Sequence, residues 1–553
     1  MSRSIVWFVA ALLGLWVLRA NVSPDFTPIR SELANARGFS RGVFNLVVLP
    51  ADQPFARAPA LTLFLYAAFL LVLAGVRPAP RSDWRGVLSS VLAAMAVVLL
   101  SAVAVSPFVS PYRIVLAPRT FALFVLLAYA ARAFGAVSAL TARWTMADAA
   151  RRRLLIVSTA VLGAAFFASA MFQTLATYDG NYSGFLHLSR EVAARAPFLQ
   201  ERPELARSLI VYDAGYDGQF MYLMAFDPFL RRFADRPQAY RAFVDNPPYR
   251  YGRIGFSVLT KIASARQSAL YPAAMLWLIV AAHFTLAALL ASAAARHGMA
   301  PLAALWSLAI PGFMSSLMSA LPEALAAAGI VAGYLSWKVG RPVVAALSFA
   351  AALLVRETGI ILILAIILAC RREEPHTPRR WPLAASLLPV CAWRLFVAWR
   401  LFPDFGWAAI AANPNDFGAP FAGLLHLWQA GLGGAQPPPE VAAALVFPFI
   451  LPAALILAVR LLAARSGPLE IAAVVYGAVA VSLNYDKIWS HLPSGERGTF
   501  ELFVCLLLLL LESGGRPVWV RRTLTGLFLV LLAYTFFVAP DASTSRAALL
   551  LIR

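Results

Sequence analysis

Apolar runs long enough to cross a lipid bilayer recur along almost the whole chain. An apolar helix of about 20 residues spans the hydrocarbon core and satisfies its backbone hydrogen bonds internally. Hydrophobic residues make up 61% of the 553 residues and charged residues 13%, against roughly 45–50% and 25% in soluble domains. The sequence therefore predicts an all-α polytopic membrane protein with about fifteen transmembrane helices. The predicted spans are residues 4–20, 59–77, 86–107, 115–134, 153–173, 270–295, 301–318, 321–337, 342–355, 358–371, 381–401, 440–463, 468–485, 498–514 and 522–539.

Arginine marks the loops that we expect on the cytoplasmic side. The formal charge of +20 comes almost wholly from arginine, and arginine collects in short cytoplasmic loops, so the charge indicates a membrane rather than nucleic acid as the partner. The arginines at 77–85, 143–153 and 371–380 agree with one threading. It places the protein in the cytoplasmic (inner) membrane with its amino terminus inside. The segments 174–268, 402–439 and 486–497 then face the extracytoplasmic side, together with the break at residues 356–357.

Residues that bind metals or nucleotides do not form recognisable groups. Cys370, Cys391 and Cys505 lie in or beside apolar runs, so neither a disulfide framework nor a cysteine metal site is indicated. The histidines form no cluster with ligand spacing, and the glycines form no phosphate-binding loop of the nucleotide type. We therefore predict no metal, no cofactor and no direct nucleotide substrate.

Residues 174–268 form the only long polar insertion. Its length and its aromatic content favour a packed functional segment over a connector. Asp227 and Pro228 are typical of a helix start, and Phe229 and Phe233 then give an apolar stripe beside arginines. This pattern predicts a helix that lies at the membrane interface.

The densest polar group of the insertion runs from Tyr212 to Tyr222. An aspartate at a helix start stays ionised and can accept a hydroxyl proton, which makes Asp217 the candidate catalytic base. Without a functional role, Asp217 would be a solvated loop carboxylate and Asp213 a helix cap. Arg250 and Arg253 fit equally as anchors at the membrane interface. The candidate substrate-binding residues of the insertion are Asp213, Tyr216, Gln219, Tyr222, Arg250 and Arg253.

Further candidates lie in the other segments that are predicted to face outward. Arg356 and Glu357 interrupt an apolar stretch, where charges need water, a partner or a ligand. They fit equally as a pair with each other or as helix caps, and Glu323 fits equally as a simple helix start. Arg497 precedes a span beside a glycine and suits phosphate binding, whereas His491 is more typical of a surface loop.

The span 153–173, the insertion 174–268, the run from Tyr216 to Tyr222 and the run from Arg356 to Gly359 together resemble the GT-C superfamily of membrane glycosyltransferases. The resemblance is strongest to bacterial cell-surface glycopolymer glycosyltransferases, and it covers residues 153–513. It departs in two ways, because four predicted helices come first and because no adjacent pair of acidic residues is present. We therefore divide the chain into an N-terminal transmembrane extension (1–152), a GT-C-like core (153–513) and a C-terminal helix with a tail (514–553).

The resemblance implies inverting transfer of a sugar from a polyprenyl-phosphate donor to a glycan, lipid or protein acceptor outside the cell membrane. Asp217 would take the proton of the acceptor hydroxyl. Arginines drawn from Arg250, Arg253, Arg356 and Arg497 would stabilise the leaving phosphate. The alternatives are a flippase or transporter of lipid-linked saccharides, and a glycan polymerase or ligase, which would not need Asp217 as a base.

Overall fold

The computed structural model describes residues 149–370, 381–406, 416–433, 438–541 and 543–545. The chain separates into two units at Arg143 and Trp144, and all of the described residues belong to the second unit. The predicted spans at 4–20, 59–77, 86–107 and 115–134 lie outside the described residues, as does the arginine-rich loop at 371–380.

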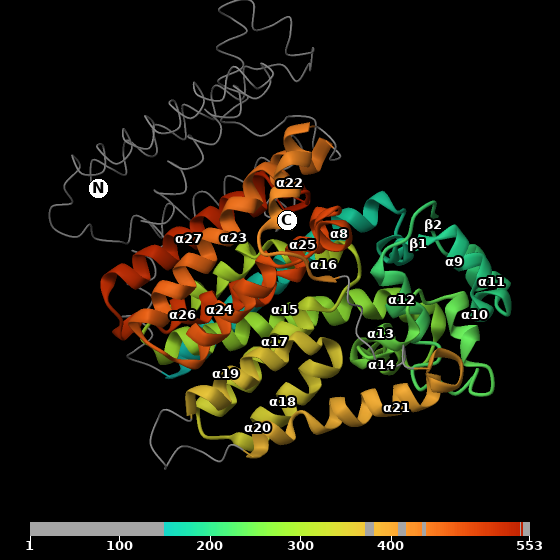
Figure 1. Cartoon of the computed structure of the whole chain (residues 1–553), viewed down its shortest axis with the longest axis horizontal. Helices are drawn as coiled ribbons and strands as arrows, with labels where there is room; N and C mark the ends of the chain where they lie inside the picture. The colour runs from blue at the N-terminus through green and yellow to red at the C-terminus, as the bar shows by residue number, and fades with distance from the viewer. Residues whose placement is uncertain (1–148, 371–380, 407–415, 434–437, 542, 546–553) are drawn as a thin grey trace, which may run out of the picture. The chain divides into compact units, whose positions relative to one another are not determined.

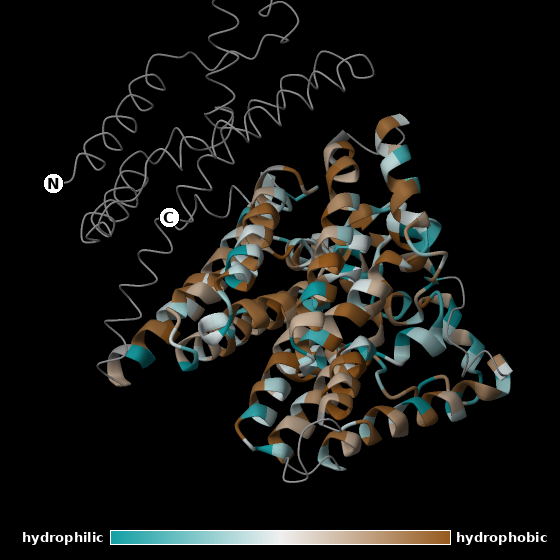
Figure 2. Ribbon diagram, turned by 60° about the vertical axis from the view of Figure 1, so that its left-hand side comes forward, coloured by the Kyte–Doolittle hydropathy of each residue, from teal (hydrophilic) through white to brown (hydrophobic). Residues whose placement is uncertain are grey.

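Long apolar helices confirm a helical integral membrane protein. Five stretches among the described residues are long and apolar enough to cross a bilayer. They consist of α8 (Ala149–Thr177), η5 with α15 (Ser268–Leu270 and Tyr271–Arg296), α20 with α21 (Trp381–Ala385 and Leu388–Phe405), α23 (Pro438–Ala464) and α27 (Val518–Phe537). Hydrophobic residues dominate these helices (Figure 2). Large apolar side chains such as Leu395, Trp399 and Phe449 are exposed, as expected of surfaces that face lipid.

One predicted span is bent in the middle. The stretch 301–318 was expected to form a single helix, but it consists of η6 (Pro301–Ala309) and α16 (Pro311–Met318), whose axes meet at 66°. Pro311 has no N–H to donate and forces Ile310 into an extended conformation, so the helix stops there. Counting the bent pair as one span gives six candidates in the described part of the chain.

The remaining apolar helices are short. These are α17 (Glu323–Lys338), α18 (Pro342–Val355), α19 (Ile360–Cys370), α24 (Pro468–Val481) and α26 (Phe500–Leu511). Each has fewer residues than the roughly 20 that a bilayer requires. The described residues therefore carry five or six candidate spans, fewer than the eleven predicted for this region in the list above. The predicted break at residues 356–357 is confirmed, because α18 ends at Val355 and the short helix η7 (Glu357–Gly359) separates it from α19.

The polar insertion folds into a series of short elements. They are η3 (Tyr182–Leu186), β1 (Leu188–Ser189), α9 (Arg190–Arg195), α10 (Pro197–Gln200), α11 (Pro203–Ser208), β2 (Val211–Tyr212), α12 (Asp217–Met224), η4 (Pro237–Ala242), α13 (Pro247–Tyr251) and α14 (Gly255–Ala263). The two strands pair in parallel, with Leu188 opposite Val211. Figure 1 shows β1, β2 and α9 to α11 together at one end of the described unit, beside α12 to α14.

The interfacial helix that we expected to begin at Asp227 does not form. The Asp227 carboxylate instead accepts hydrogen bonds from the backbone N–H groups of Arg231 (3.0 Å) and Arg232 (2.9 Å) and from the Tyr240 hydroxyl (2.6 Å). These contacts fold the chain into turns, with Leu230 at a positive φ of 53°. The predicted helix start at Asp227 was therefore wrong, because its carboxylate closes a turn and binds Tyr240, 13 residues further along the chain.

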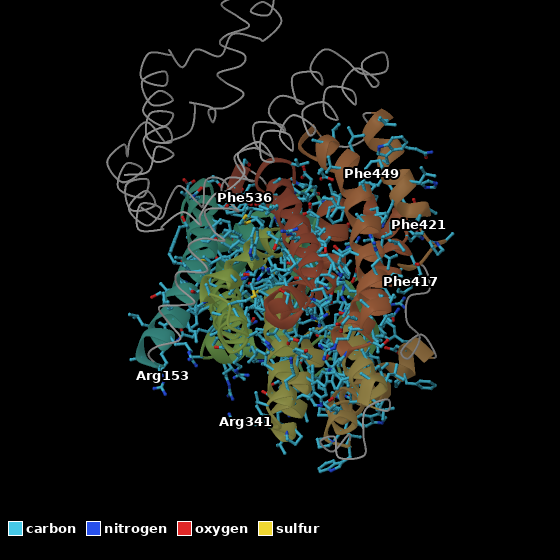
Figure 3. All side chains as sticks on the ribbon, turned by 90° about the vertical axis from the view of Figure 1, so that its left-hand side faces the viewer. Arg153, Arg341, Phe417, Phe421, Phe449 and Phe536 are labelled. Atoms are coloured by element: carbon cyan, nitrogen blue, oxygen red, sulfur yellow. The ribbon has the colours of Figure 1, made fainter. Side chains whose placement is uncertain are left out.

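Helix packing brings the ends of several elements to one place. α15 packs against α8 and α17, α17 packs against α18, and α24 packs against α26. The short helix α25 (Leu492–Gly498) packs against α16 and against η10 (Tyr485–Trp489), the turn before it. In Figure 3 the labelled Arg153, near the start of α8, lies at the lower left of the described unit, and Arg341, before α18, lies below it, both away from the labelled Phe417, Phe421 and Phe449 at the right.

Candidate functional site

Close backbone packing sets the position of Asp217. This residue is the first of α12, and the next residue, Gly218, lies directly against the carbonyl oxygen of Ser319. Any side chain at position 218 would collide with that backbone atom. The glycine therefore lets the start of α12 pack against the chain between α16 and α17.

Two arginines from distant parts of the chain hold the Asp217 carboxylate. Arg250 Nη2 lies 2.9 Å from Asp217 Oδ1, and Arg497 Nη2 lies 3.0 Å from Asp217 Oδ2. The Asp217 side chain is 27% exposed, so it remains within reach of a ligand. Burial by itself raises the pKa of Asp217, but the charges and hydrogen bonds of Arg250 and Arg497 outweigh it and hold the pKa well below its usual range. Asp217 is therefore ionised.

Arg250 lies between two carboxylates. Its Nε and Nη2 donate to the two carboxylate oxygens of Asp245, each at 2.9 Å. Its guanidinium carbon stands 4.6 Å from the centre of the Phe220 ring. The cap of α13 orients this segment, because the Asn246 side chain accepts a hydrogen bond from the Tyr249 N–H. Arg250 can thus leave Asp217 without losing its other acidic partner.

Arg497 has hydrogen-bonding capacity that its neighbours do not use. It is buried, its guanidinium stacks over the Tyr216 ring at 5.0 Å, and its Nε lies 3.3 Å from Glu323 Oε1 in poor alignment for a hydrogen bond. Its Nε and Nη1 find no hydrogen-bond partner among the described residues, and neither does Glu323 Oε2. Buried polar groups are normally paired, so an unpaired buried guanidinium N–H is a natural place for an anionic oxygen.

Tyr216 completes this side of the site. Its hydroxyl lies 2.6 Å from Ser494 Oγ, and its ring lies 5.0 Å from the exposed ring of His491. Burial raises the pKa of Tyr216 to about 12, which keeps its hydroxyl protonated at neutral pH. His491 therefore borders the site from the surface, as expected of a loop histidine.

The ionic network continues into the broken span. Arg356 Nη1 lies 3.0 Å from Glu323 Oε1, and Arg356 Nε lies 2.9 Å from Glu501 Oε1. Glu357 faces the other way and accepts a 2.6 Å hydrogen bond from Arg253 Nε, with Arg394 at 3.8 Å. Arg356 and Glu357 thus bind different partners and do not pair with each other. The complete network alternates guanidinium and carboxylate groups, namely Asp245, Arg250, Asp217, Arg497, Glu323, Arg356 and Glu501, with Arg253, Glu357 and Arg394 beside them.

Three of the predicted binding residues lie away from this network. Asp213 is exposed and pairs with Arg190 at 3.3 Å. Tyr222 is fully buried, with its ring edge-on to aromatic neighbours. The buried Gln219 accepts a hydrogen bond from the Ser189 N–H at 3.0 Å, which joins α12 to β1.

Sequence reasoning missed four members of the site: Asp245, Arg394, Ser494 and Glu501. Glu501 carried a usable signal, because it is an acidic residue at the start of the apolar run Phe500–Leu511, and such charges are rare without a function or a partner. The other three are ordinary loop or helix-surface residues in the sequence. Asp245 precedes Arg250 by five residues, but only the fold brings Arg394 beside Glu357 and Ser494 beside Tyr216.

An apolar groove adjoins the network. A cavity of about 680 Å³ lies between α14, the end of α18 and α21, with Ile254, Val258, Leu354, Trp393 and Phe396 in its wall and Arg231 and Arg400 among its lining. Ile254 follows Arg253 in the chain, and Leu354 precedes the Arg356–Glu357 break by two residues. Two of its lining residues therefore lie within two positions of Arg253 and of the Arg356–Glu357 break in the chain.

The site has no arrangement of metal ligands. Within the described residues, no group of three or more His, Cys, Asp or Glu side chains is placed to hold a metal ion. The carboxylates of the network are instead matched with guanidinium groups. The charged chemistry of this site is therefore that of arginine.

Comparison with known proteins adds no further constraint. No family model matches the chain, and neither does any curated protein or solved structure.

Proposed function

We propose that the protein is an integral membrane glycosyltransferase of GT-C type. It would move a sugar from a polyprenyl-phosphate donor to a glycan, lipid or protein acceptor by inverting transfer. The observation that carries the proposal is the pairing of an ionised, partly exposed Asp217 with Arg497, a buried arginine whose Nε and Nη1 groups bind no described residue. A carboxylate and a phosphate-binding cation side by side are the two groups that this reaction needs.

The donor would place its phosphate at Arg497 and Arg250 and its lipid tail in the apolar groove. Guanidinium groups bind phosphate oxygens in a fixed fork geometry, and Arg497 Nη1 has no hydrogen-bond partner among the described residues. The groove wall is mostly aliphatic and aromatic and includes α21, which is part of a candidate span, so a prenyl chain suits it. Arg253 and Arg356 would contribute to the positive field, although carboxylates already occupy them.

The two arginines give the proposed base a way to respond to the donor. In the free protein they weaken Asp217 as a base, because they stabilise its ionised form. A bound phosphate competes for the same guanidinium groups, and Arg250 and Arg497 then stabilise Asp217 less. The pKa of Asp217 rises in consequence. Its carboxylate becomes a better proton acceptor once the donor is in place.

The reaction would proceed as a single displacement. The acceptor hydroxyl oxygen attacks the anomeric carbon, the bond from that carbon to the phosphate oxygen breaks, and polyprenyl phosphate leaves. The hydroxyl proton passes to Asp217, and Arg497 and Arg250 stabilise the charge of the leaving phosphate. The anomeric configuration inverts because the attack and the departure occur on opposite faces.

The wider architecture of this proposal follows the sequence prediction. About fifteen spans, the N-terminal extension 1–152, the core 153–513 and the C-terminal helix 514–553 belong to it. So do the cytoplasmic membrane as location and the extracytoplasmic side as the side of the site.

Transfer of radiolabelled sugar tests the proposal directly. Purified wild type, Asp217→Asn and Glu204→Gln, reconstituted in nanodiscs, would be given a panel of polyprenyl-phosphate sugars and a membrane extract as acceptor. We expect transfer by wild type with one donor and a loss of about 10²–10⁴-fold in Asp217→Asn, the range for removal of a general base. Glu204 is an exposed acid that pairs only with Arg207 in the same insertion, so Glu204→Gln should retain full activity. Equal activity of Asp217→Asn and wild type would exclude Asp217 as the base.

The bent helix pair favours a flippase of lipid-linked saccharides as the second candidate. Discontinuous helices are typical of transporters, and η6 and α16 meet at 66°. A flippase has no need of a base, so Asp217→Asn should still move labelled lipid across proteoliposomes. Folded wild-type protein that moves lipid but transfers no sugar from any donor would support this candidate over the enzyme.

A further inference from the structure

Arg497 has a neighbour whose side chain points away from the site. Glu496 precedes it in α25 and is 1% exposed. Its Oε1 accepts a 2.6 Å hydrogen bond from the Tyr534 hydroxyl of α27, and its Oε2 lies 2.8 Å from Ser315 Oγ of α16. Arg497 thus connects α25 to Asp217, whereas Glu496 connects it to Ser315 of α16 and Tyr534 of α27.

Ser315 also contacts a second carboxyl group. Its Oγ lies 2.9 Å from Oδ2 of Asp541, just beyond α27. A serine hydroxyl has one proton, so it can donate to only one of these two oxygens. The other contact is a hydrogen bond only when that carboxyl group itself carries a proton and donates it to Ser315 Oγ.

The surroundings of this contact contain acids and hydroxyls. The titratable or charged groups on the elements that contact α25 are Glu440 and Arg460 of α23, Tyr485, Asp486 and Lys487 of η10, Glu501 and Cys505 of α26, and Arg521, Arg522 and Tyr534 of α27. Glu440 binds the Leu492 N–H at 3.2 Å, and Glu501 is engaged by Arg356. Among the described residues, neither Glu496 nor Asp541 has a cation within ion-pair distance. Burial raises the pKa of Glu496 to about 8 and also raises the pKa of Asp541.

Backbone packing makes this contact matter for Arg497. A side chain at Gly312 of α16 would collide with the Glu496 carbonyl and would lie 3.0 Å from Arg497 Cα. α16 and α25 therefore touch backbone to backbone at the two residues in question. Moving α25 away from α16 would move the Arg497 side chain away from Asp217.

We propose that Glu496 and Asp541 share a proton through Ser315 and that this contact makes Glu496 the positioning residue for Arg497. With a proton present, the contact holds α25 on α16 and α27. Without it, two carboxylates lie against the same serine with no cation within ion-pair distance among the described residues, and their repulsion favours release of α25. The role of Arg497 in transfer rests on the proposed function, whereas the tethering of α25 does not.

The sign of the pH dependence follows from the raised pKa of Glu496. In a released state, Glu496 titrates as an ordinary glutamic acid near 4.5, whereas in the packed state its pKa is about 8. The packed state therefore binds the extra proton between these values, and the contact weakens as pH rises through this window. Above about pH 8 both states have lost the proton and the effect levels off.

Hydrogen exchange of residues 492–498 measures the tether without any substrate. Full-length protein in nanodiscs would be labelled from pH 5 to pH 9, and exchange at each pH would be divided by the intrinsic rate. We expect the opening equilibrium of wild type to rise by up to about tenfold per pH unit between pH 5 and pH 8. Glu496→Gln keeps a neutral group that can accept from Tyr534 and donate to Ser315, so its opening should depend on pH less steeply than that of wild type. The double variant Glu496→Gln/Asp541→Asn should show no dependence on pH, because it also removes the carboxyl group whose pKa burial raises.

A matched control separates this effect from general loss of a buried acid. Glu470 is also buried, but it pairs with Arg516 at 2.6 Å, away from α25. Glu470→Gln should show the wild-type pH profile at residues 492–498. A flat profile in wild type, or the same slope in wild type and Glu496→Gln, would overturn the proposal.

Transfer kinetics supply the second readout. If Glu496 positions Arg497, the KM of wild type for the donor should rise with pH more steeply than that of Glu496→Gln. If the protein transfers no sugar but shows the pH-dependent exchange, the proposed function is wrong and the tethering of α25 by Glu496 still holds. Protein whose donor KM rises equally in both variants would refute the positioning role.

Discussion

Asp217 and Glu496 are two carboxyl groups whose surroundings are set by α25. Asp217 is bound by Arg497 of that helix, and Glu496 is the residue before Arg497, yet the two carboxyl groups carry different charges. Asp217 receives hydrogen bonds from Arg497 and Arg250, and the pKa of Asp217 is depressed. Glu496 receives hydroxyl groups and faces another carboxyl, and the pKa of Glu496 is raised to about 8. Burial acts in the same direction on both groups. The neighbouring charges therefore decide which carboxyl group is ionised.

The two sides of α25 differ in function, one facing Asp217 through Arg497 and the other facing Ser315 and Tyr534 through Glu496. An ionised carboxylate between cations can respond when an anion competes for those cations. A protonated carboxyl group between hydroxyls has little to offer a ligand, but it makes directional hydrogen bonds that hold a backbone in place. The Arg497 side of α25 is therefore suited to binding an anion, and the Glu496 side is suited to holding the backbone of α25 in place.

Removal of Arg497 should have the largest effect on stability, because it leaves Asp217 and Glu323 without one of their cations. Arg497→Met leaves Asp217 with Arg250 alone and removes a cation from beside the buried Glu323. We expect a loss of about 3–5 kcal/mol in unfolding free energy, the range for breaking a buried ion pair. Unfolding in mixed micelles with increasing SDS would measure it. Arg497→Lys keeps the charge but loses the fork, so equal stability of the Met and Lys variants would show that the ion pairs contribute nothing.

Arg253 should matter less, because Glu357 is partly exposed. The Glu357 side chain is 35% exposed and has Arg394 as a second partner at 3.8 Å. Arg253→Met should therefore lower the unfolding free energy by about 1–2 kcal/mol, toward the low end for hydrogen bonds to charged groups. The same micelle titration would detect it, with Arg394→Met as the variant that removes only the weaker partner. A larger loss in Arg394→Met than in Arg253→Met would reverse this ranking.

Removing one hydroxyl sharpens the account of Glu496. Tyr534→Phe deletes the hydrogen bond to Glu496 Oε1 without a change in packing volume. We expect a destabilisation of about 1 kcal/mol. Because that bond also stabilises the ionised form of Glu496, its loss should move the alkaline end of the exchange profile at 492–498 to higher pH. A shift to lower pH would mean that Tyr534 stabilises the protonated form instead.

An exposed ion pair should have the smallest effect on the unfolding free energy. Arg207 and Glu204 lie 2.8 Å apart on α11, and their side chains are 74% and 85% exposed. Arg207→Ala should change neither transfer nor the unfolding free energy by a measurable amount, since such pairs are worth less than about 1 kcal/mol. A clear loss in this variant would indicate that α11 contacts a partner or the bilayer.

Composition and apolar runs were sufficient to predict a helical membrane protein and several of its spans. α8, α15, α23 and α27 lie where the runs placed them, because an apolar helix of this length is dictated by local sequence alone. The charges at residues 356–357 also predicted the break between α18 and α19 correctly. The bend at Pro311 was missed, although the proline itself was visible, since the run 301–318 was read for hydropathy and not for backbone donors.

Local sequence also named most of the charged residues that meet at the site. Asp217, Arg250, Glu323, Arg356 and Arg497 all belong to the network. Asp213, Gln219 and Tyr222 shared the same motif but point elsewhere, because successive residues around a helix start face different directions. Adjacent positions in a motif therefore did not identify which side chains share a site.

The sequence by itself determined that this chain enters a membrane and that its charges gather between the spans. Only the tertiary structure decided that Arg497 and Arg250 hold Asp217 while Glu496 turns toward Ser315 and Tyr534. Bilayer insertion depends on hydropathy, which is a sum over neighbouring residues. The ionisation of a carboxyl group depends on charges within a few ångströms, and here those charges come from residues tens to hundreds of positions away.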